Sequence, residues 1–398
     1  MSNEMKSVAR CLCLVALVLV LSQCRNDATQ RAPWEHSDDP TVTDGGDNHF
    51  SFSEIVENGE LIVLTLSGPD TYFDYHGKGM GTQYLLCSDF AGKTGLQLRV
   101  ELCGDTTELL ERLHSGEGDV VMMQMSDSCG AVIACGYSER KGVAWLVSKQ
   151  NGELADTLNK WFDPKILAEV KKEETRRFST QNVRRVTASP MLNASAGIIS
   201  EYDALFQRYA PVAHWDWRLV AAQCYQESAF DAQAVSWAGA CGLMQIMPYT
   251  AEVMGLSMEQ IYDPEANIRA AARYIARLEA QFTDVSDAAE RRCFVLAAYN
   301  GGAQHIRDAM ALTEKYGGNK YRWHDVSIYV RGLCETRYYT DAVVKNGYMR
   351  GEETADYVDS VLSRWDYYRG KARGSSVGGG SQDYYVPQKA TKEHRFKL

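Results

Sequence analysis

Residues 216–230 read DWRLVAAQCYQESAF, and this stretch predicts an amphipathic helix that ends at an acidic residue. Asp216 is a favoured N-cap residue. Val220, Cys224 and Glu227 recur at i, i+4 and i+7, so they share one helical face. Burial of a carboxylate at the end of such an apolar stripe raises its pKa, and a carboxyl group that stays protonated near neutral pH can act as a general acid. Taken alone, a Glu near the end of a helix is more often a salt-bridge partner than a catalytic acid.

Three further blocks follow this helix in order: 236–248 (SWAGACGLMQIMP), 298–302 (AYNGG) and 353–358 (ETADYV). Ser236 lies nine positions after Glu227. Gly239 and Gly242 permit backbone turns in which a side chain would not fit. Pro248 stands where the first turn of a new helix is expected.

The four blocks together resemble the lytic transglycosylases of glycoside hydrolase family 23, relatives of goose-type lysozyme. The matching segment covers roughly residues 198–368 and keeps the order and spacing of the blocks. The resemblance implies an all-α lysozyme-like domain that acts on peptidoglycan glycan strands. It also implies that Glu227 is the only general acid and later the base.

The resemblance assigns substrate-binding roles to Ser236, Gly242, Met244, Gln245, Tyr299, Asn300 and Tyr357, and a supporting role to Glu353. It implies that Ser236 hydrogen-bonds the N-acetyl group of the sugar and that Met244 and Gln245 line the glycan groove. Tyr299 and Asn300 would shape the pocket, Tyr357 would place its hydroxyl near Glu227 or the substrate, and Glu353 would hold helices together. For the Tyr and Met positions, packing in the core is the alternative.

A site with one carboxylate implies a particular chemistry. Glycosidases with two carboxylates use the second as a nucleophile or to activate water. With Glu227 alone, the muramoyl C6 hydroxyl can attack C1 and leave a 1,6-anhydro end. Asp231 is close in sequence, but we expect it to cap a loop. Two alternatives remain: a hydrolytic muramidase of the goose-lysozyme type, and a non-catalytic lipoprotein that binds or senses the cell wall.

Helical patterns extend over residues 198–369, where one apolar stripe includes Ile268, Ala271, Ala272, Ile275, Leu278 and Phe282. Further helices are expected at 287–299, 303–316 and 352–368. The sequence NGG at 300–302 separates the first two of these and is a turn signal.

Residues 58–178 have a different pattern, in which apolar strands alternate with helices. Strands are expected at 61–66, 96–102, 119–125 and 143–148, and this alternation favours a parallel α/β sheet. The segments 59–66 (GELIVLTL), 116–119 (GEGD) and 142–149 (GVAWLVSK) resemble a family-3 periplasmic solute-binding domain. The region is too short for the two lobes of that family, so we expect a single lobe used for docking or regulation. Whether the lobe takes a small ligand or a protein stays open, and Arg140 is the candidate for a ligand carboxylate.

The first 24 residues have the features of an export signal. Lys6 and Arg10 precede an apolar run at 11–21, which is too short to span a bilayer. The sequence LSQC at 21–24 resembles a bacterial lipoprotein box, so Cys24 is the predicted lipidation site; a plain cleaved signal is the alternative. We therefore expect a periplasmic protein that an N-terminal lipid holds at the inner leaflet of the outer membrane. Residues 25–57 are predicted to be a tether, 179–197 a linker and 370–398 a basic disordered tail.

The composition excludes several classes of function. The chain of 398 residues has 42 Lys+Arg against 52 Asp+Glu, so no basic bias suggests nucleic-acid binding. No C-x-x-C or H-E-x-x-H motif occurs, and no metal or other cofactor is expected. After Cys24, eight cysteines remain, four before residue 140 and four after residue 220. These even numbers permit disulfides in an oxidising compartment, and buried free thiols are the alternative.

Overall fold

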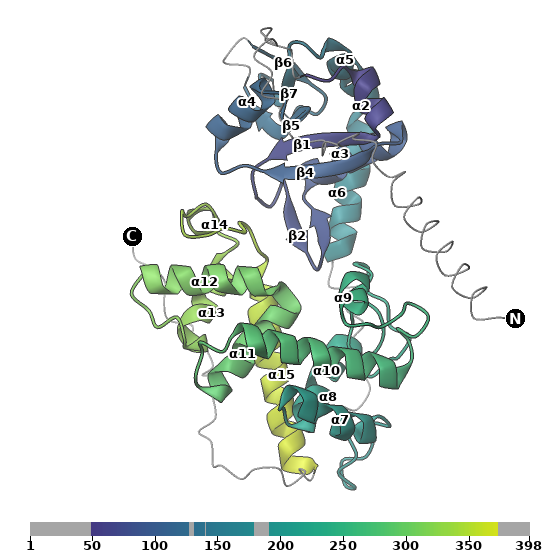
Figure 1. Cartoon of the computed structure of the whole chain (residues 1–398), viewed down its shortest axis with the longest axis vertical. Helices are drawn as coiled ribbons and strands as arrows, with labels where there is room; N and C mark the ends of the chain where they lie inside the picture. Colours follow the sequence, from purple (N-terminus) through teal and green to yellow (C-terminus); the bar gives the residue numbers. More distant parts are fainter. Residues whose placement is uncertain (1–48, 127–130, 140, 179–190, 373–398) are drawn as a thin grey trace, which may run out of the picture. The chain divides into compact units, whose positions relative to one another are not determined.

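The computed structural model describes residues 49–126, 131–139, 141–178 and 191–372. An α/β part comes first along the chain, and an all-α part follows it (Figure 1). The predicted fold class is therefore confirmed for both halves. Within the described ranges, no helix combines the length and the apolar character needed to cross a membrane.

The α/β part contains one five-stranded sheet with the strand order β4-β1-β5-β7-β6. Its strands are β1 (Glu60–Thr65), β4 (Gln97–Leu102), β5 (Val120–Met125), β6 (Val132–Cys135) and β7 (Ala144–Ser148). A separate two-stranded hairpin consists of β2 (Phe73–Tyr75) and β3 (Lys78–Met80).

The sheet is mixed, whereas the alternation of strands and helices predicted a parallel one. β1 pairs in parallel with β4 and with β5, but β7 runs antiparallel to both β5 and β6. Parallel neighbours need a long crossover, which helices supply between β1 and β5. The described residues between β6 and β7, 136–139 and 141–143, contain no helix. The short connection there produces an antiparallel hairpin.

Helices cover both faces of this sheet. They are α2 (Phe52–Asn58), α3 (Thr82–Thr94), α4 (Thr106–His114), α5 (Gly152–Trp161) and α6 (Pro164–Phe178). On one face, Leu86 and Phe90 of α3 are buried together with Leu158 of α5. On the other face, Leu109 and Leu113 of α4 form a second cluster. Strands buried on both faces explain the nearly continuous apolar runs in this half of the sequence.

Helix α2 lies inside the segment 25–57 that the sequence predicts to be a tether. Ser51 and Glu54 form a capping box at its N-terminus. Ile55 is buried in the core of the α/β part. Ordered structure therefore begins before residue 58, because this single apolar residue anchors a short, well-capped helix.

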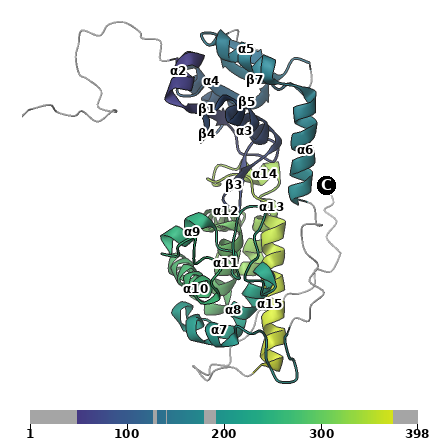
Figure 2. The same cartoon turned by 90° about the vertical axis from the view of Figure 1, so that its right-hand side faces the viewer.

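The all-α part contains α7 (Asp203–Tyr209), α8 (Trp217–Ser228), α9 (Pro248–Val253), α10 (Pro264–Gln281), α11 (Ala288–Gly301), α12 (Ala303–Lys315), α13 (Trp323–Gly332), α14 (Thr336–Tyr339) and α15 (Gly351–Lys371). α15 packs against α8, α11 and α13, and Figure 2 shows it along its length. The predicted stripe on α10 is buried as expected. This packing makes α15 the central helix around which the site is built.

The end of the predicted linker at 179–197 folds with the helical part. Met191 is buried in the helical core, and Asn193 and Ile198 exchange backbone hydrogen bonds. Several predictions lie outside the described residues: the signal and Cys24, Arg140, residues 179–190 of the linker, and all but the first residues of the tail.

The described cysteines are free thiols. They are Cys87, Cys103, Cys135, Cys224, Cys241, Cys293 and Cys334. All except Cys334 are buried, so they pack as small apolar residues. For the four cysteines after residue 220, the structure therefore favours free thiols over disulfides.

Candidate active site

Glu227 lies in the last turn of α8. The Asp216 side chain accepts a 2.9 Å hydrogen bond from the Arg218 backbone N–H and begins the helix. The helix ends at Ala229, whose φ of 53° is left-handed. The Ser228 hydroxyl donates to the Leu243 carbonyl at 2.7 Å. The end of the helix, and with it Glu227, is thus joined to the glycine-rich loop at 236–248.

The Glu227 carboxyl group meets Tyr357 of α15. The Tyr357 hydroxyl donates a hydrogen bond to Glu227 Oε1 at 2.5 Å. Burial raises the pKa of Glu227 to about 8, and the hydrogen bond from Tyr357 opposes part of that rise. Glu227 is therefore protonated near neutral pH, as a general acid must be before it reacts.

The loop at 236–248 is held by its own backbone and by Ser236. The Ser236 hydroxyl accepts a 2.9 Å hydrogen bond from the Ala240 N–H. This contact leaves the hydroxyl proton of Ser236 available to an acceptor. Gly242 has a φ of 76°, and a Cβ there would lie 2.7 Å from the Ile261 carbonyl oxygen. The left-handed backbone and the lack of space for a Cβ therefore explain why a glycine stands at position 242, without any contact with substrate.

The two residues predicted to line the groove have structural roles in the loop. Met244 is fully buried, so its side chain packs in the core and the core-packing alternative holds for it. Gln245 has a φ of 46° and turns its amide back onto the loop. Its Nε2 donates to the carbonyl oxygens of Gly242 and Ala234. The compact turn uses these side chains to hold itself together.

Asn267 of α10 was missed in the sequence, although it holds the same loop. Asn267 is fully buried, and its Oδ1 accepts a 2.9 Å hydrogen bond from the Met244 N–H. Its Nδ2 donates to the carbonyl oxygens of Cys241 and Ile261. A polar residue next to the apolar stripe of α10 was the available signal.

The block at 298–302 ends helix α11 beside the loop. The Tyr299 hydroxyl donates to the Met244 carbonyl at 2.8 Å. Burial raises the pKa of Tyr299, and the nearby charge of Glu227 adds to the effect. Asn300 accepts a 2.8 Å hydrogen bond from the Thr354 hydroxyl of α15. Tyr299 and Asn300 thus fasten α11 to the loop and to α15.

Glu353 binds a different partner from the one predicted. It was expected to hold helices of the catalytic domain together, but it accepts a 2.6 Å hydrogen bond from the Tyr75 hydroxyl of the β2–β3 hairpin. It also forms an ion pair with Arg350. Tyr75 in turn stacks on Trp237, the neighbour of Ser236, with ring centroids 5.3 Å apart. The partner of Glu353 is therefore the β2–β3 hairpin of the α/β part, where the sequence predicted a helix of the catalytic domain.

A second carboxylate near Glu227 would change the chemistry, and Asp231 was the candidate. Its Oδ1 accepts a 2.9 Å hydrogen bond from the Gln233 N–H, which is the loop cap that the sequence predicts. Only burial and the Tyr357 hydrogen bond shift the pKa of Glu227. Within the described ranges, no group of three or more His, Cys, Asp or Glu side chains could hold a metal ion.

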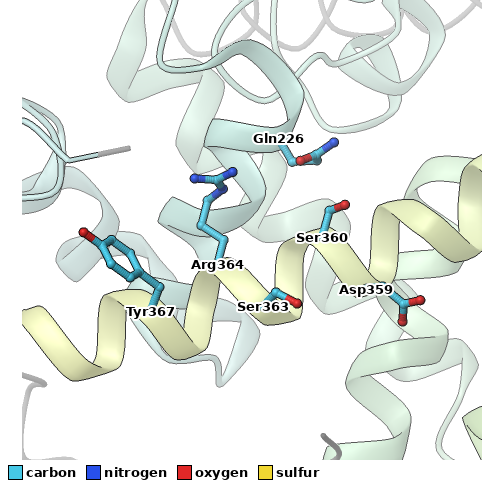
Figure 3. Close-up of a pocket in the computed structure, with 6 residues that line it drawn as sticks. All are labelled: Gln226, Asp359, Ser360, Ser363, Arg364 and Tyr367. Atoms are coloured by element: carbon cyan, nitrogen blue, oxygen red, sulfur yellow. The ribbon is translucent and has the colours of Figure 1, made fainter. Parts of the chain in front are cut away.

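An open pocket of about 480 Å³ lies between α8 and α15. Figure 3 shows its lining residues, which are Gln226, Asp359, Ser360, Ser363, Arg364 and Tyr367. Gln226 comes from α8 and the others come from α15. None of them is a predicted site residue. Gln226 is the sequence neighbour of Glu227, but Glu227 itself does not line the pocket.

Comparison with known proteins agrees with this geometry. Residues 204–322 match the family described as the transglycosylase SLT domain. The matched segment contains Glu227, Ser236, Tyr299 and Asn300, whereas Tyr357 lies beyond it.

The chain is 31% identical over 292 residues to the membrane-bound lytic murein transglycosylase F of Photobacterium profundum, covering 71% of this chain and 56% of that protein. It is 30% identical to the protein of the same name from Desulfosudis oleivorans, covering 69% of this chain and 62% of that protein. The chain thus spans little more than half the length of these relatives.

Among solved structures, the soluble lytic transglycosylase SLT70 from Escherichia coli is 27% identical, with 42% of this chain and 24% of that chain covered and a TM-score of 0.30. The sequence match and the relatives lead to one conclusion: the chain is a homologue of the membrane-bound lytic murein transglycosylase F proteins and carries a transglycosylase SLT domain.

Proposed function

We propose that this protein cleaves the β-1,4 bond between N-acetylmuramic acid and N-acetylglucosamine in peptidoglycan and forms 1,6-anhydromuramoyl ends. The observation that carries the proposal is the half-buried Glu227, whose raised pKa of about 8 keeps it protonated at neutral pH and which accepts a 2.5 Å hydrogen bond from Tyr357. The relatives named lytic murein transglycosylases and the SLT domain support it.

In the first step, Glu227 donates its proton to the glycosidic oxygen, and the bond from that oxygen to C1 of the muramoyl residue breaks. Glu227 is then a carboxylate, and the Tyr357 hydroxyl stabilises this charge by its hydrogen bond. In the second step, the C6 hydroxyl oxygen attacks C1, and its proton returns to Glu227. No water is consumed, and the carboxyl group recovers its starting state.

The surrounding residues would orient the sugar. Ser236 retains a hydroxyl proton that can bond the carbonyl oxygen of an N-acetyl group. Gly242 and Gln245 would act by setting the path of the loop, and Tyr299 and Asn300 by fixing its position against α11 and α15. We no longer assign Met244 to the groove, because its side chain is buried.

Mass spectrometry of the products released from purified sacculi tests this function. We expect anhydromuropeptides from the wild type and none from Glu227→Gln. Products that are heavier by one water, with reducing ends, would instead indicate a hydrolytic muramidase. Release of no product, with retained binding to the sacculi, would indicate a non-catalytic wall-binding protein.

We also propose that the protein is held in the periplasm by a lipid on Cys24, at the inner leaflet of the outer membrane. The naming of the relatives as membrane-bound supports membrane association. Metabolic labelling with a fatty-acid analogue tests the lipid, because Cys24→Ser should abolish the label. Fractionation of inner and outer membranes then tests the location.

For residues 58–178 we propose a role in docking or regulation. The single sheet supports this role, because a hinged clamp needs two lobes that close on a ligand. Deletion of residues 25–190, which leaves Met191 and the Asn193–Ile198 pairing in place, tests the proposal. A change in the rate of sacculus lysis supports regulation, and an unchanged rate with weaker retention on the wall supports docking.

A further inference from the structure

Gln223 is a buried amide in α8, in a place where an apolar side chain would be expected. It is fully buried, and the residues on both sides of it, Ala222 and Cys224, are buried as well. Neither Gln223 Nε2 nor Oε1 has a hydrogen bond of standard geometry within the described part of the chain. A buried polar group without a partner destabilises a protein, so such a group needs a reason.

The position of Gln223 next to Glu227 and Tyr357 supplies such a reason. Gln223 precedes Glu227 by four residues, so the two side chains lie on the same face of α8, with Cβ atoms about 5–6 Å apart. The amide also acts on Tyr357, since it lowers the pKa of the Tyr357 hydroxyl against the rise caused by burial. Gln223 is thus close to both Glu227 and the tyrosine that donates a hydrogen bond to it.

We propose that Gln223 is a positioning residue, whose amide N–H supports the Tyr357 oxygen while the Tyr357 hydroxyl donates to ionised Glu227. This inference rests on the proposed function. A donor on the tyrosine oxygen polarises the O–H bond and strengthens the next hydrogen bond in the chain. The support matters most after Glu227 has released its proton, because the Tyr357 hydroxyl then donates to a charged group.

The test substitutes Gln223→Met, because Met has a similar shape and no polar group. The melting temperature should rise by about 2–4 °C, since the unpaired amide is removed. The rate of sacculus lysis should fall about three- to tenfold, the factor expected for the loss of one hydrogen bond. The alkaline limb of the pH–rate profile should move to higher pH, because the ionised form of Glu227 loses support.

A double-mutant cycle with Tyr357→Phe separates positioning from packing. Without the tyrosine oxygen, Gln223→Met should change neither the rate nor the pH profile. An equal loss of rate in both backgrounds, or a loss without a shift of the alkaline limb, would overturn the proposal. Gln223→Leu repeats the cycle if the Met variant does not fold.

A readout without substrate keeps this inference separate from the proposed function. The pKa of Glu227 can be measured from the pH dependence of unfolding, by comparison with Glu227→Gln. Gln223→Met should raise that pKa when Tyr357 is present, whether or not the wild type releases anhydromuropeptides. An unchanged pKa would overturn the role of Gln223, and absence of anhydromuropeptides would overturn only the proposed function.

Discussion

The Tyr357 hydroxyl donates to Glu227 Oε1 at 2.5 Å, although 130 residues separate the two in sequence. Glu227 comes from the last turn of α8, and Tyr357 from α15. One turn before Tyr357, Glu353 accepts a hydrogen bond from Tyr75. Helix α15 thus contacts Glu227 through Tyr357, and one turn earlier it contacts the β2–β3 hairpin through Glu353.

Replacement of Glu227 by Gln should change stability in a pH-dependent way. The folded pKa of about 8 lies above the ordinary value of 4.5, so the folded protein keeps a proton that the unfolded chain releases. The contribution of protonated Glu227 to the free energy of unfolding is therefore lost as pH rises from about 4.5 to 8. Glu227→Gln should match the wild type at pH 4 and exceed it by a few kcal/mol at pH 9, as measured by denaturant unfolding.

The matched control is Glu252→Gln, on the exposed side of α9. This variant should change the free energy of unfolding by less than about 0.5 kcal/mol at either pH. If Glu227→Gln showed the same flat response, Glu227 would have an ordinary pKa and could not be the neutral acid of the mechanism.

Tyr357→Phe should raise the pKa of Glu227, because the hydrogen bond from Tyr357 favours the carboxylate. The alkaline limb of the pH–rate profile should move upward from about pH 8. The maximal rate should fall about tenfold or more, since the ionised state of Glu227 loses its donor. A limb at unchanged pH would show that the hydroxyl does not act on Glu227 in the working enzyme.

Gly242→Ala should destabilise the protein by about 2–4 kcal/mol, because the backbone is left-handed and the new methyl group meets buried neighbours. The Cβ would lie 2.5 Å from Asn267 Nδ2. Gly255→Ala is the control, with a similar φ of 71° and no atom within 4 Å. It should cost only about 1 kcal/mol in thermal or denaturant unfolding. Equal costs would mean that the contact with Asn267 adds nothing.

Asn267→Ala should weaken the same loop by removing one acceptor and two donated hydrogen bonds. Because these groups are buried, we expect a loss of about 2–4 kcal/mol in the free energy of unfolding. Asn193→Ala is the control, since Asn193 is exposed and also bonds a nearby backbone N–H. It should cost about 1 kcal/mol or less. A loss no larger for Asn267→Ala would contradict its structural role.

The sequence by itself determined the helix that carries Glu227, because its N-cap and apolar spacing are local features. It also determined the alternation of strands and helices at 58–178 and the break between α11 and α12, which the structure places at Gly302. Local signals missed strand β6 and the antiparallel direction of β7, since strand direction depends on which neighbour is available for pairing.

Only the tertiary structure decided the contacts of the site. The sequence assigned Met244 and Gln245 to the groove, yet the loop buries the first and turns the second onto its own backbone. Asn267 and Gln223 were not singled out, because the burial of a polar residue is set by helices distant in sequence. The raised pKa of Glu227 has the same origin: the residue type is local, whereas the desolvation arises where α8 meets α15.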